Sequence, residues 1–311
     1  MKGADLARLD LVPLSTIRTV AADIKIAHSV FALPFAILAA FMAAASGDGV
    51  IAWGAFWGQL ILVMVAMVFA RTAAMLANRI FDAALDARNP RTSGRAIPSG
   101  RLSIEKARGA WVVAALLFLG CCALFGAFYG NWWPLILGLP VLAWICLYGL
   151  AKRFTKWCHV WLGSSLALSP VAAAIAIQPA SLASPSIWLL SVMVLLWVAG
   201  FDVIYALQDV EVDRRDRLHS MPGTLGVGRA LLVARVMHLG AVAALVGAAL
   251  TSPVLGGLML AAAVLVALLL LYEHLTVARW GTTKMALAFF TLNGLVSCLI
   301  GLAGVLDITL R

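Results

Sequence analysis

The sequence predicts an all-α integral membrane protein with nine transmembrane helices and a cytoplasmic N-terminus. Of its 311 residues, 63% are hydrophobic and only 12% are charged, whereas a water-soluble globular domain carries about 25% charged residues. The mean hydropathy is +1.01, and the apolar residues fall into runs of about 20, the length that crosses a bilayer as a helix. A soluble globular fold is therefore excluded, and a single membrane domain over residues 1–311 is expected.

The nine apolar runs are the expected transmembrane helices. The run at 132–150 differs from the others because it holds two prolines, which disfavour a regular helix. The first 26 residues are polar and mixed in charge, so no cleavable signal peptide is expected and the first run is long enough to remain as an anchor. In chain order the runs cover residues 27–46, 55–77, 110–129, 132–150, 160–178, 187–207, 229–250, 254–273 and 286–306.

Lysines and arginines are concentrated in alternate connections between these runs. The N-terminal tail, the connections after the second, fourth and eighth runs, and the segment 208–235 after the sixth hold 21 of the 23 basic residues, whereas the connections at 46–54, 130–131, 179–186 and 251–253 hold none. Because basic connections stay cytoplasmic, the N-terminus is predicted inside and the C-terminus outside. The net charge of +9 then reflects topology and affinity for anionic head groups and substrates, and nucleic-acid binding is not expected.

Carboxylates gather in two segments on the predicted cytoplasmic side. Seven of the 14 lie at 82–86 or 202–216, each segment at the end of a long apolar run. Steps of four residues advance about 40° around a helix and about 6 Å along it, so residues at that spacing should line one helix face. Two such faces opposed across a bundle would enclose a polar cavity. The two sets are Asn78, Asp82 and Asp86, followed by Arg88, Arg91 and Arg95, and Tyr205, Asp209 and Asp213, followed by Arg214, Arg215 and Arg217.

The two acidic sets indicate a divalent cation bound together with a diphosphate. Carboxylates at the rim of a membrane span are costly unless a cation holds them, and Mg²⁺ usually takes one or two carboxylates together with substrate phosphates. A solvated or salt-bridged helix end is the alternative for either set alone, but the shared spacing, side and arginines disfavour it for both. Arg71 is a further candidate, because it lies about 10 Å above Asn78 on nearly the same helix face, inside an apolar run.

These residues match two motifs, through which the chain resembles the UbiA-type intramembrane aromatic prenyltransferases. The second family motif, Asp-x-x-Tyr-x-x-x-Asp-x-x-x-Asp, is complete at Asp202, Tyr205, Asp209 and Asp213. The first motif, Asn-Asp-x-x-Asp-x-x-x-Asp, begins at Asn78 and departs only at Arg79, where Asp is usual.

Further similarity covers most of the chain. It includes Arg71 at its distance before Asn78, the segment 95–100 and the segment 152–155, so that pseudo-repeat motifs occupy 71–100 and 202–223. The segments 24–36 and 218–222, with Asn78 and Arg79, resemble the branch of 4-hydroxybenzoate polyprenyltransferase-like enzymes. That branch includes enzymes similar to the prenyltransferases of the futalosine route to menaquinone.

The resemblance implies a fold, an activity and residue roles. It implies a UbiA-like bundle of nine helices in the bacterial inner membrane, with the active site facing the cytoplasm. The implied reaction is Mg²⁺-dependent transfer of a polyprenyl group from a polyprenyl diphosphate to an aromatic acid acceptor, 4-hydroxybenzoate or 1,4-dihydroxy-6-naphthoate, in ubiquinone or menaquinone biosynthesis.

The implied roles fall into three groups. The metal ligands would be Asn78, Asp82, Asp209 and Asp213, with Arg79 left out of the set. The catalytic residues would be Asp202, which orients the phenol and accepts its proton, Tyr205, and Arg71, which pairs with the acceptor carboxylate. Diphosphate binding, or support of the metal ligands, would come from Asp86, Arg88, Arg91, Arg95, Lys152 and Arg214.

Three alternatives stand beside this interpretation. The acceptor could be another molecule, such as a haem or chlorophyll precursor. A multi-span transporter or anion channel is disfavoured because the ionisable residues crowd at the cytoplasmic ends of the spans, whereas transporters bind substrate near the midplane. A protein that binds the prenylated lipid without turnover would keep the diphosphate site but would not need Asp202 or Tyr205.

Other polar and sulfur-containing residues are expected to serve structure. The histidines His28, His159, His238 and His274 show no partner pattern and are expected at interfaces or in packing, and Glu273 is expected at the membrane interface. The five cysteines lack metal-ligand spacing, so they are expected to be buried small hydrophobes without a zinc or disulfide role. Trp132 and Trp133 should form an aromatic belt at the outer interface.

Overall fold

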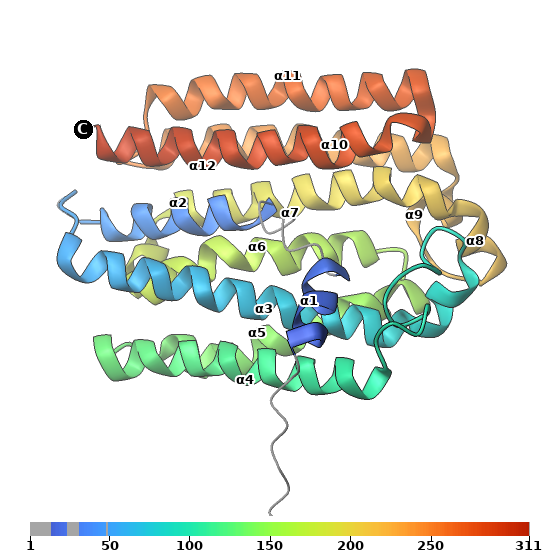
Figure 1. Cartoon of the computed structure of the whole chain (residues 1–311). Helices are drawn as coiled ribbons and strands as arrows, with labels where there is room; N and C mark the ends of the chain where they lie inside the picture. The colour runs from blue at the N-terminus through green and yellow to red at the C-terminus, as the bar shows by residue number, and fades with distance from the viewer. Residues whose placement is uncertain (1–13, 24–30, 48, 311) are drawn as a thin grey trace, which may run out of the picture.

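The computed structural model describes residues 14–23, 31–47 and 49–310 of the chain, and within those ranges it is helical and contains no strand. The all-α prediction is thereby confirmed (Figure 1). The α-helices are α1 (Leu14–Asp23), α2 (Leu33–Ala44), α3 (Trp53–Arg88), α4 (Ile104–Tyr129), α5 (Trp133–Leu147), α6 (Cys158–Ile177), α7 (Pro185–Tyr205), α8 (Val210–Arg215), α9 (Met221–Leu225), α10 (Val227–Thr251), α11 (Gly257–Trp280) and α12 (Asn293–Thr309).

Short helical turns of other kinds join several of these helices. Four 3-10 turns cover Tyr148–Arg153, Pro179–Ala183, Ala206–Asp209 and Gly281–Lys284. A π-helical segment, Leu287–Leu292, leads into α12. The turns at Tyr148–Arg153 and Ala206–Asp209 matter for function, because they hold residues of the predicted site.

Eight helical segments of the described chain are long and apolar enough to cross a membrane, and each overlaps one of the last eight predicted spans. The first predicted span, 27–46, corresponds to the shorter apolar helix α2. Residues 24–30, which include His28 and most of the similar segment 24–36, lie outside the described residues. The count of nine spans and the side of the N-terminus therefore remain predictions.

The long helices lie side by side in one bundle, with α7 in its interior (Figure 1). The α7 helix packs against both α6 and α10, and α3 packs against α4. At Gly163 of α6 a Cβ atom would overlap the carbonyl oxygen of Leu195, so the glycine allows α6 and α7 to approach closely, as small residues do in membrane bundles. Trp197 of α7 is fully buried, with its ring centroid 5.4 Å from that of Phe35 and 5.1 Å from that of Phe201.

A second, smaller core lies between α3, α4 and α5. Cys121, Cys122 and Cys146 are buried in it, which confirms the packing role expected of them. The prediction was wrong for Cys298, which is exposed, and Cys158 is only half-buried. A cysteine inside an apolar run can face either protein or lipid, and the composition of the run does not distinguish the two.

Local sequence explains where α4 begins and ends. Ser103 caps the N-terminus by accepting a hydrogen bond from the backbone N–H of Lys106, as serine does at this position. Gly130 ends the helix with φ 69°, a left-handed conformation that glycine adopts without steric cost. Trp132 and Trp133 follow directly and are both half-exposed. They lie at the end of the bundle opposite to α8, α9 and the loop at 89–103.

The second acidic set does not lie on one continuous α-helix, and this part of the prediction was wrong. The α7 helix ends at Tyr205, the 3-10 turn covers Ala206–Asp209, and α8 starts at Val210. A 3-10 turn has about 3.0 residues per turn instead of 3.6, so a spacing of four no longer keeps side chains on one face. The first set lies on the uninterrupted helix α3, as predicted.

Candidate functional site

A cavity of about 1160 Å³ is enclosed mainly by α3, α4, α5, α6 and α7. Away from the basic connections its wall is apolar, with residues such as Val63, Phe118, Phe125, Leu137 and Leu168. Polar groups line the part near the basic connections: Asp23, Arg71, Asn78, Arg79, Arg91, Arg95, Arg101, Tyr148, Asp202 and Tyr205. The cavity therefore suits an amphiphilic ligand that has an anionic head and a long apolar body.

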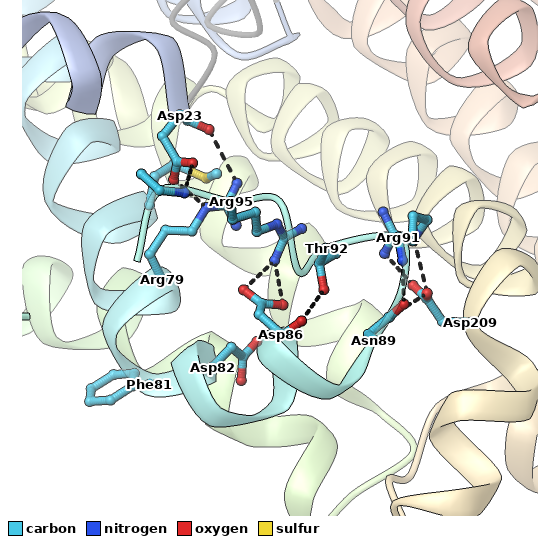
Figure 2. Close-up of polar contacts among 12 residues, drawn as sticks. Asp23, Arg79, Phe81, Asp82, Asp86, Asn89, Arg91, Thr92, Arg95 and Asp209 are labelled. Carbon is cyan, nitrogen blue, oxygen red and sulfur yellow. Dashed lines mark hydrogen bonds and ion pairs between the residues drawn. The ribbon is translucent and has the colours of Figure 1, made fainter. Parts of the chain in front are cut away.

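Basic side chains from other segments hold the carboxylates of the first acidic set, and Figure 2 shows the contact of Asp86 with Arg95. Asp82 is only 2% exposed, and its Oδ2 accepts a hydrogen bond from Lys152 Nζ at 2.7 Å. Its Oδ1 lies 3.5 Å from Arg153 Nη2 but has no hydrogen-bond partner among the described residues. Asp86 is buried and accepts two hydrogen bonds from Arg95 Nη1, both at 2.7 Å.

The second acidic set is joined to the loop that follows the first (Figure 2). Arg91 donates to Asp209 from Nε at 2.9 Å and also from Nη2, and Asn89 Nδ2 donates to Asp209 Oδ1 at 2.9 Å. Arg91 Nη1 donates to the hydroxyl of Tyr205 at 3.1 Å. Asp213 is buried. The loop at 89–103 thus contacts both sets, and the direct opposition of their faces stays a prediction.

Arg91 remains a cation in this setting. Burial favours the neutral form of its guanidinium, but the hydrogen bond with Asp209 and the negative charge of that carboxylate outweigh burial and raise the pKa of Arg91 above its ordinary value. The group therefore offers a permanent positive charge at the polar end of the cavity.

A third connection completes the polar end. Lys152, which binds Asp82, lies in the 3-10 turn after α5, and its carbonyl oxygen accepts a hydrogen bond from the backbone N–H of His219 at 2.7 Å. Tyr148 starts the same turn and lines the cavity. Gly149 lies against Asn78, whose side chain a Cβ atom at Gly149 would meet. Close approach of this turn to α3 therefore depends on the glycine.

Arg71, Asn78, Asp202 and Tyr205 all line the same cavity, as their predicted roles require. The side chain of Asp202 is 22% exposed, and its Oδ2 atom lies 2.7 Å from the Nδ1 atom of His159. His159, expected at an interface or in packing, is buried as a packing residue would be but has a specific partner that the sequence did not indicate. Its partner lies 43 residues away in the sequence, and no local pattern marks such a pair.

Two of the predicted diphosphate ligands lie elsewhere. The side chain of Arg88 is 60% exposed and pairs with Asp216 at 3.7 Å, and Arg214 is exposed and donates to the carbonyl oxygen of Gly223 at 3.4 Å. Neither belongs to the described lining of the cavity, and Asp82, Asp86, Lys152, Asp209 and Asp213 do not belong to it either. Asp86 and Asp209 reach the cavity through Arg95 and Arg91, which do line it. Arg79, in contrast, is buried and pairs with Asp23 at 3.0 Å (Figure 2), an arrangement that agrees with its exclusion from the metal ligands.

Three cavity residues were missed by the sequence interpretation: Asp23, Arg101 and Tyr148. Asp23 and Arg101 are charged residues in polar segments near apolar runs. Charged residues at such positions are often simply solvated, so the sequence does not distinguish a cavity residue from a solvated one. Tyr148 stands four residues before Lys152, the spacing of one helical turn, but nothing in that spacing distinguishes a cavity residue from a packing residue. Their shared location depends on how α1, α5 and the loop at 89–103 meet.

The donor set fits a magnesium ion bound together with phosphate. Among the described residues no group of three or more His, Cys, Asp or Glu side chains converges, so a cage made of protein alone is not formed. Mg²⁺ commonly takes only one or two carboxylates and completes its coordination with water and substrate phosphates. Asn78 and Asp82 on one side and Asp209 and Asp213 on the other provide such partial sets. Oδ1 of Asp82, which accepts no hydrogen bond from the described residues and lies 3.5 Å from Arg153 Nη2, is a candidate ligand atom in the first set.

A separate buried polar cluster joins α7, α10, α11 and the start of α12, and it corrects the expectation for Glu273. Glu273 is buried, not interfacial, and its Oε1 accepts from Asn293 Nδ2 at 3.1 Å. His238 and His274 contact each other at 3.1 Å. Trp197 Nε1 donates to Asn293 Oδ1 at 2.7 Å. None of these five residues belongs to the described lining of the cavity.

Comparison with known proteins identifies the family of this fold. Residues 32–299 match the model of the UbiA prenyltransferase family. The 4-hydroxybenzoate geranyltransferase 2 of Lithospermum erythrorhizon is 29% identical over 187 residues, which are 56% of this chain and 59% of the relative. The 4-hydroxybenzoate octaprenyltransferase of Serratia proteamaculans is 30% identical over 155 residues, 50% of this chain and 51% of the relative. The chain thus spans less than two thirds of the length of these curated relatives.

Solved structures are similar over nearly the whole chain. The apo structure of a UbiA homolog from Aeropyrum pernix K1 superposes with a TM-score of 0.78 at 30% identity, covering 91% of this chain and 98% of the homolog. A UbiA homolog from Archaeoglobus fulgidus bound to GPP and Mg²⁺ superposes with a TM-score of 0.68 at 18% identity, covering 95% and 99%. The second likeness concerns the fold alone.

Proposed function

Because the chain belongs to the UbiA prenyltransferase family, we propose that it catalyses Mg²⁺-dependent transfer of a polyprenyl group from a polyprenyl diphosphate to an aromatic acid. One observation carries the proposal: the apolar cavity ends in a group of arginines that lies between two sets of carboxylates. This is the arrangement that a lipid with a diphosphate head requires. The names of the curated relatives, which are 4-hydroxybenzoate prenyltransferases, support it.

The donor would bind with its diphosphate among Arg91, Arg95 and Arg101 and with its tail in the apolar part of the cavity. Asn78, Asp82, Asp209 and Asp213 are the residues that would hold Mg²⁺. When bound, the ion would neutralise charge on the diphosphate. Lys152, which already contacts Asp82, would bind a phosphate oxygen from the same side.

The reaction would proceed by ionisation of the donor. The allylic C–O bond breaks and its electron pair leaves with the diphosphate, whose growing charge the arginines stabilise. The electron-rich ring of the acceptor then forms a C–C bond with the allylic cation. The ring proton is lost, and Asp202 is the group in the cavity that we assign to accept it. Tyr205, whose hydroxyl is held by Arg91, would contact the allylic group.

An acid acceptor is supported by Arg71, which lines the cavity from within the membrane-spanning part of α3. Its guanidinium would form a charge-assisted pair with the carboxylate of 4-hydroxybenzoate or 1,4-dihydroxy-6-naphthoate. Arg88 and Arg214 would act only indirectly, because Arg88 pairs with Asp216 and Arg214 donates to the carbonyl oxygen of Gly223. The site would face the cytoplasm of a bacterial inner membrane, because the basic connections gather at the same end of the chain's spans.

The test is turnover by the purified protein in lipid vesicles. Geranyl diphosphate would be supplied with a mixture of 4-hydroxybenzoate, 1,4-dihydroxy-6-naphthoate and phenol, in the presence of Mg²⁺ or of excess chelator. We expect diphosphate release that requires both metal and acceptor, together with a prenylated acid detected by mass spectrometry. Diphosphate release without any prenylated product, or no release with any acceptor, would reject the function.

A further inference from the structure

His159 uses both of its ring nitrogens in specific contacts. It is the second residue of α6 and its side chain is only 4% exposed. Its Nδ1 atom lies 2.7 Å from Oδ2 of Asp202 on α7, and its Nε2 atom accepts a hydrogen bond from the backbone N–H of Met221 on α9 at 3.2 Å. One imidazole therefore ties together three elements at the polar end of the cavity.

The contact with Met221 determines which nitrogen carries the imidazole proton. A backbone N–H can only donate, so the Nε2 atom must be the acceptor. The proton of the neutral ring is then on Nδ1, directed at the carboxylate of Asp202. Turning the ring over would break both hydrogen bonds, since a flip exchanges each ring nitrogen with a ring carbon.

His159 lies behind Asp202 as seen from the cavity. Asp202 lines the cavity with 22% of its side chain exposed, whereas His159 is almost fully enclosed. A buried donor of fixed direction restricts the rotation of the carboxylate that it holds, in the way that the partners of metal-binding histidines and catalytic bases do.

We propose that His159 is a positioning residue for the acceptor reaction: through its Nδ1–H it holds the Asp202 carboxylate toward the ring of the aromatic acceptor. The inference rests on the proposed function, because Asp202 is assigned there as the proton acceptor. The backbone of Met221 sets the tautomer, so the segment after the second acidic set contributes to the geometry of Asp202.

The test uses substitutions that separate the two nitrogens. The amide nitrogen of asparagine can take the place of Nδ1, whereas that of glutamine takes the place of Nε2, so His159→Asn keeps a donor to Asp202 and His159→Gln does not. We expect His159→Gln and His159→Leu to lower kcat with the acid acceptor about 10- to 100-fold, with little change in the KM for geranyl diphosphate, and His159→Asn to recover most of the rate. Equal activity of the three variants would overturn the inference.

Two controls exclude a merely structural role. His238→Gln removes an equally buried histidine outside the described cavity lining. It should therefore lower the Tm as much as His159→Gln does, but leave the kcat of the folded protein unchanged. In a double-mutant cycle, His159→Leu should cost little further rate once Asp202 is replaced by Asn. If His159→Leu lowered the rate by the same factor with and without Asp202→Asn, His159 would not act through Asp202.

A measurement without turnover separates this inference from the proposed function. The ¹⁵N spectrum of the full-length protein labelled at histidine, with His159 assigned from the His159→Gln variant, should show the Nδ1–H tautomer, and Asp202→Asn should shift that signal. The Nε2–H tautomer would overturn the positioning role even in an active enzyme. The Nδ1–H tautomer in a protein without prenyl transfer would reject the function, and with it the role in catalysis.

Discussion

Arg79 and Asp23 form a buried ion pair that joins α3 to α1, with the Nε atom of Arg79 3.0 Å from Oδ2 of Asp23 (Figure 2). The other carboxylate oxygen, Oδ1, accepts a hydrogen bond from the backbone N–H of Ala96 at 2.7 Å. Asp23 and Arg79 also line the cavity. Arg79, which stands where the first family motif usually has Asp, therefore holds Asp23, and through it α1 and the loop at 89–103, at the edge of the site.

The first prediction concerns this pair. Arg79→Asp would set two carboxylates against each other, and breaking a buried pair costs about 3–5 kcal/mol, so we expect a clear fall in Tm and loss of activity. The exchange Arg79→Asp with Asp23→Arg restores opposite charges and should recover part of both. Thermal unfolding in detergent and product formation are the measurements. Wild-type behaviour of the single variant, or an exchange no better than it, would contradict the prediction.

The second prediction concerns the metal. Asp82→Ala or Asp209→Ala should reduce turnover by about 100-fold or more, since loss of one electrostatic contact to a transferring group has costs of that order, and excess chelator should abolish the wild-type rate. Asp307→Asn is the matched control. Asp307 is also buried, but it caps α11 at the other end of the bundle by accepting from the backbone N–H groups of Gly256 and Met259, both at 2.8 Å.

The control should lower stability by about 0.5–2 kcal/mol, the value of a lost helix cap, and leave the Mg²⁺ dependence of turnover unchanged. The measurements are diphosphate release against Mg²⁺ concentration, and Tm. Full activity of the wild type in chelator would refute the metal requirement, and an equal loss of rate in Asp307→Asn would show that the effect is not specific to the site.

The third prediction concerns the acceptor. Arg71→Leu should raise the KM for 4-hydroxybenzoate or lower kcat, because loss of a charge-assisted pair in a poorly hydrated cavity costs on the order of 2–5 kcal/mol. Binding of geranyl diphosphate should change little. Prenylation of phenol, which lacks the carboxylate, should be as fast in the variant as in the wild type. If phenol suffers as much as the acid, or if donor binding falls, Arg71 serves the diphosphate instead.

The fourth prediction concerns topology. Ser93 is exposed in the loop at 89–103, so a membrane-impermeant thiol reagent should label Ser93→Cys only from the cytoplasmic side of the bilayer. Trp132→Cys, at a half-exposed position of the opposite end, should react only from outside. Both variants are made in a background in which Cys158 and Cys298 are replaced by Ala. Labelling of Ser93→Cys from outside would invert the orientation.

Much of this architecture follows from local sequence. The long apolar runs predicted where eight of the helical segments lie, because a backbone in hydrocarbon must satisfy its own hydrogen bonds and does so within each helix. The alignment of Asn78, Asp82 and Asp86 was predictable for the same reason, since α3 continues through them without interruption. At Ala206–Asp209 the chain tightens into a 3-10 turn, and helix periodicity alone contained no sign of that change.

What the sequence by itself determined was the membrane class, the helical segments and the two acidic motifs, because each depends on residues within a few turns of one another. The tertiary structure alone decided the partners: Lys152 for Asp82, Arg91 for Asp209, and His159 for Asp202. These pairs join residues 70, 118 and 43 positions apart. A buried carboxylate needs a counter-charge or a donor, but which group provides it depends on how helices from distant parts of the chain pack together.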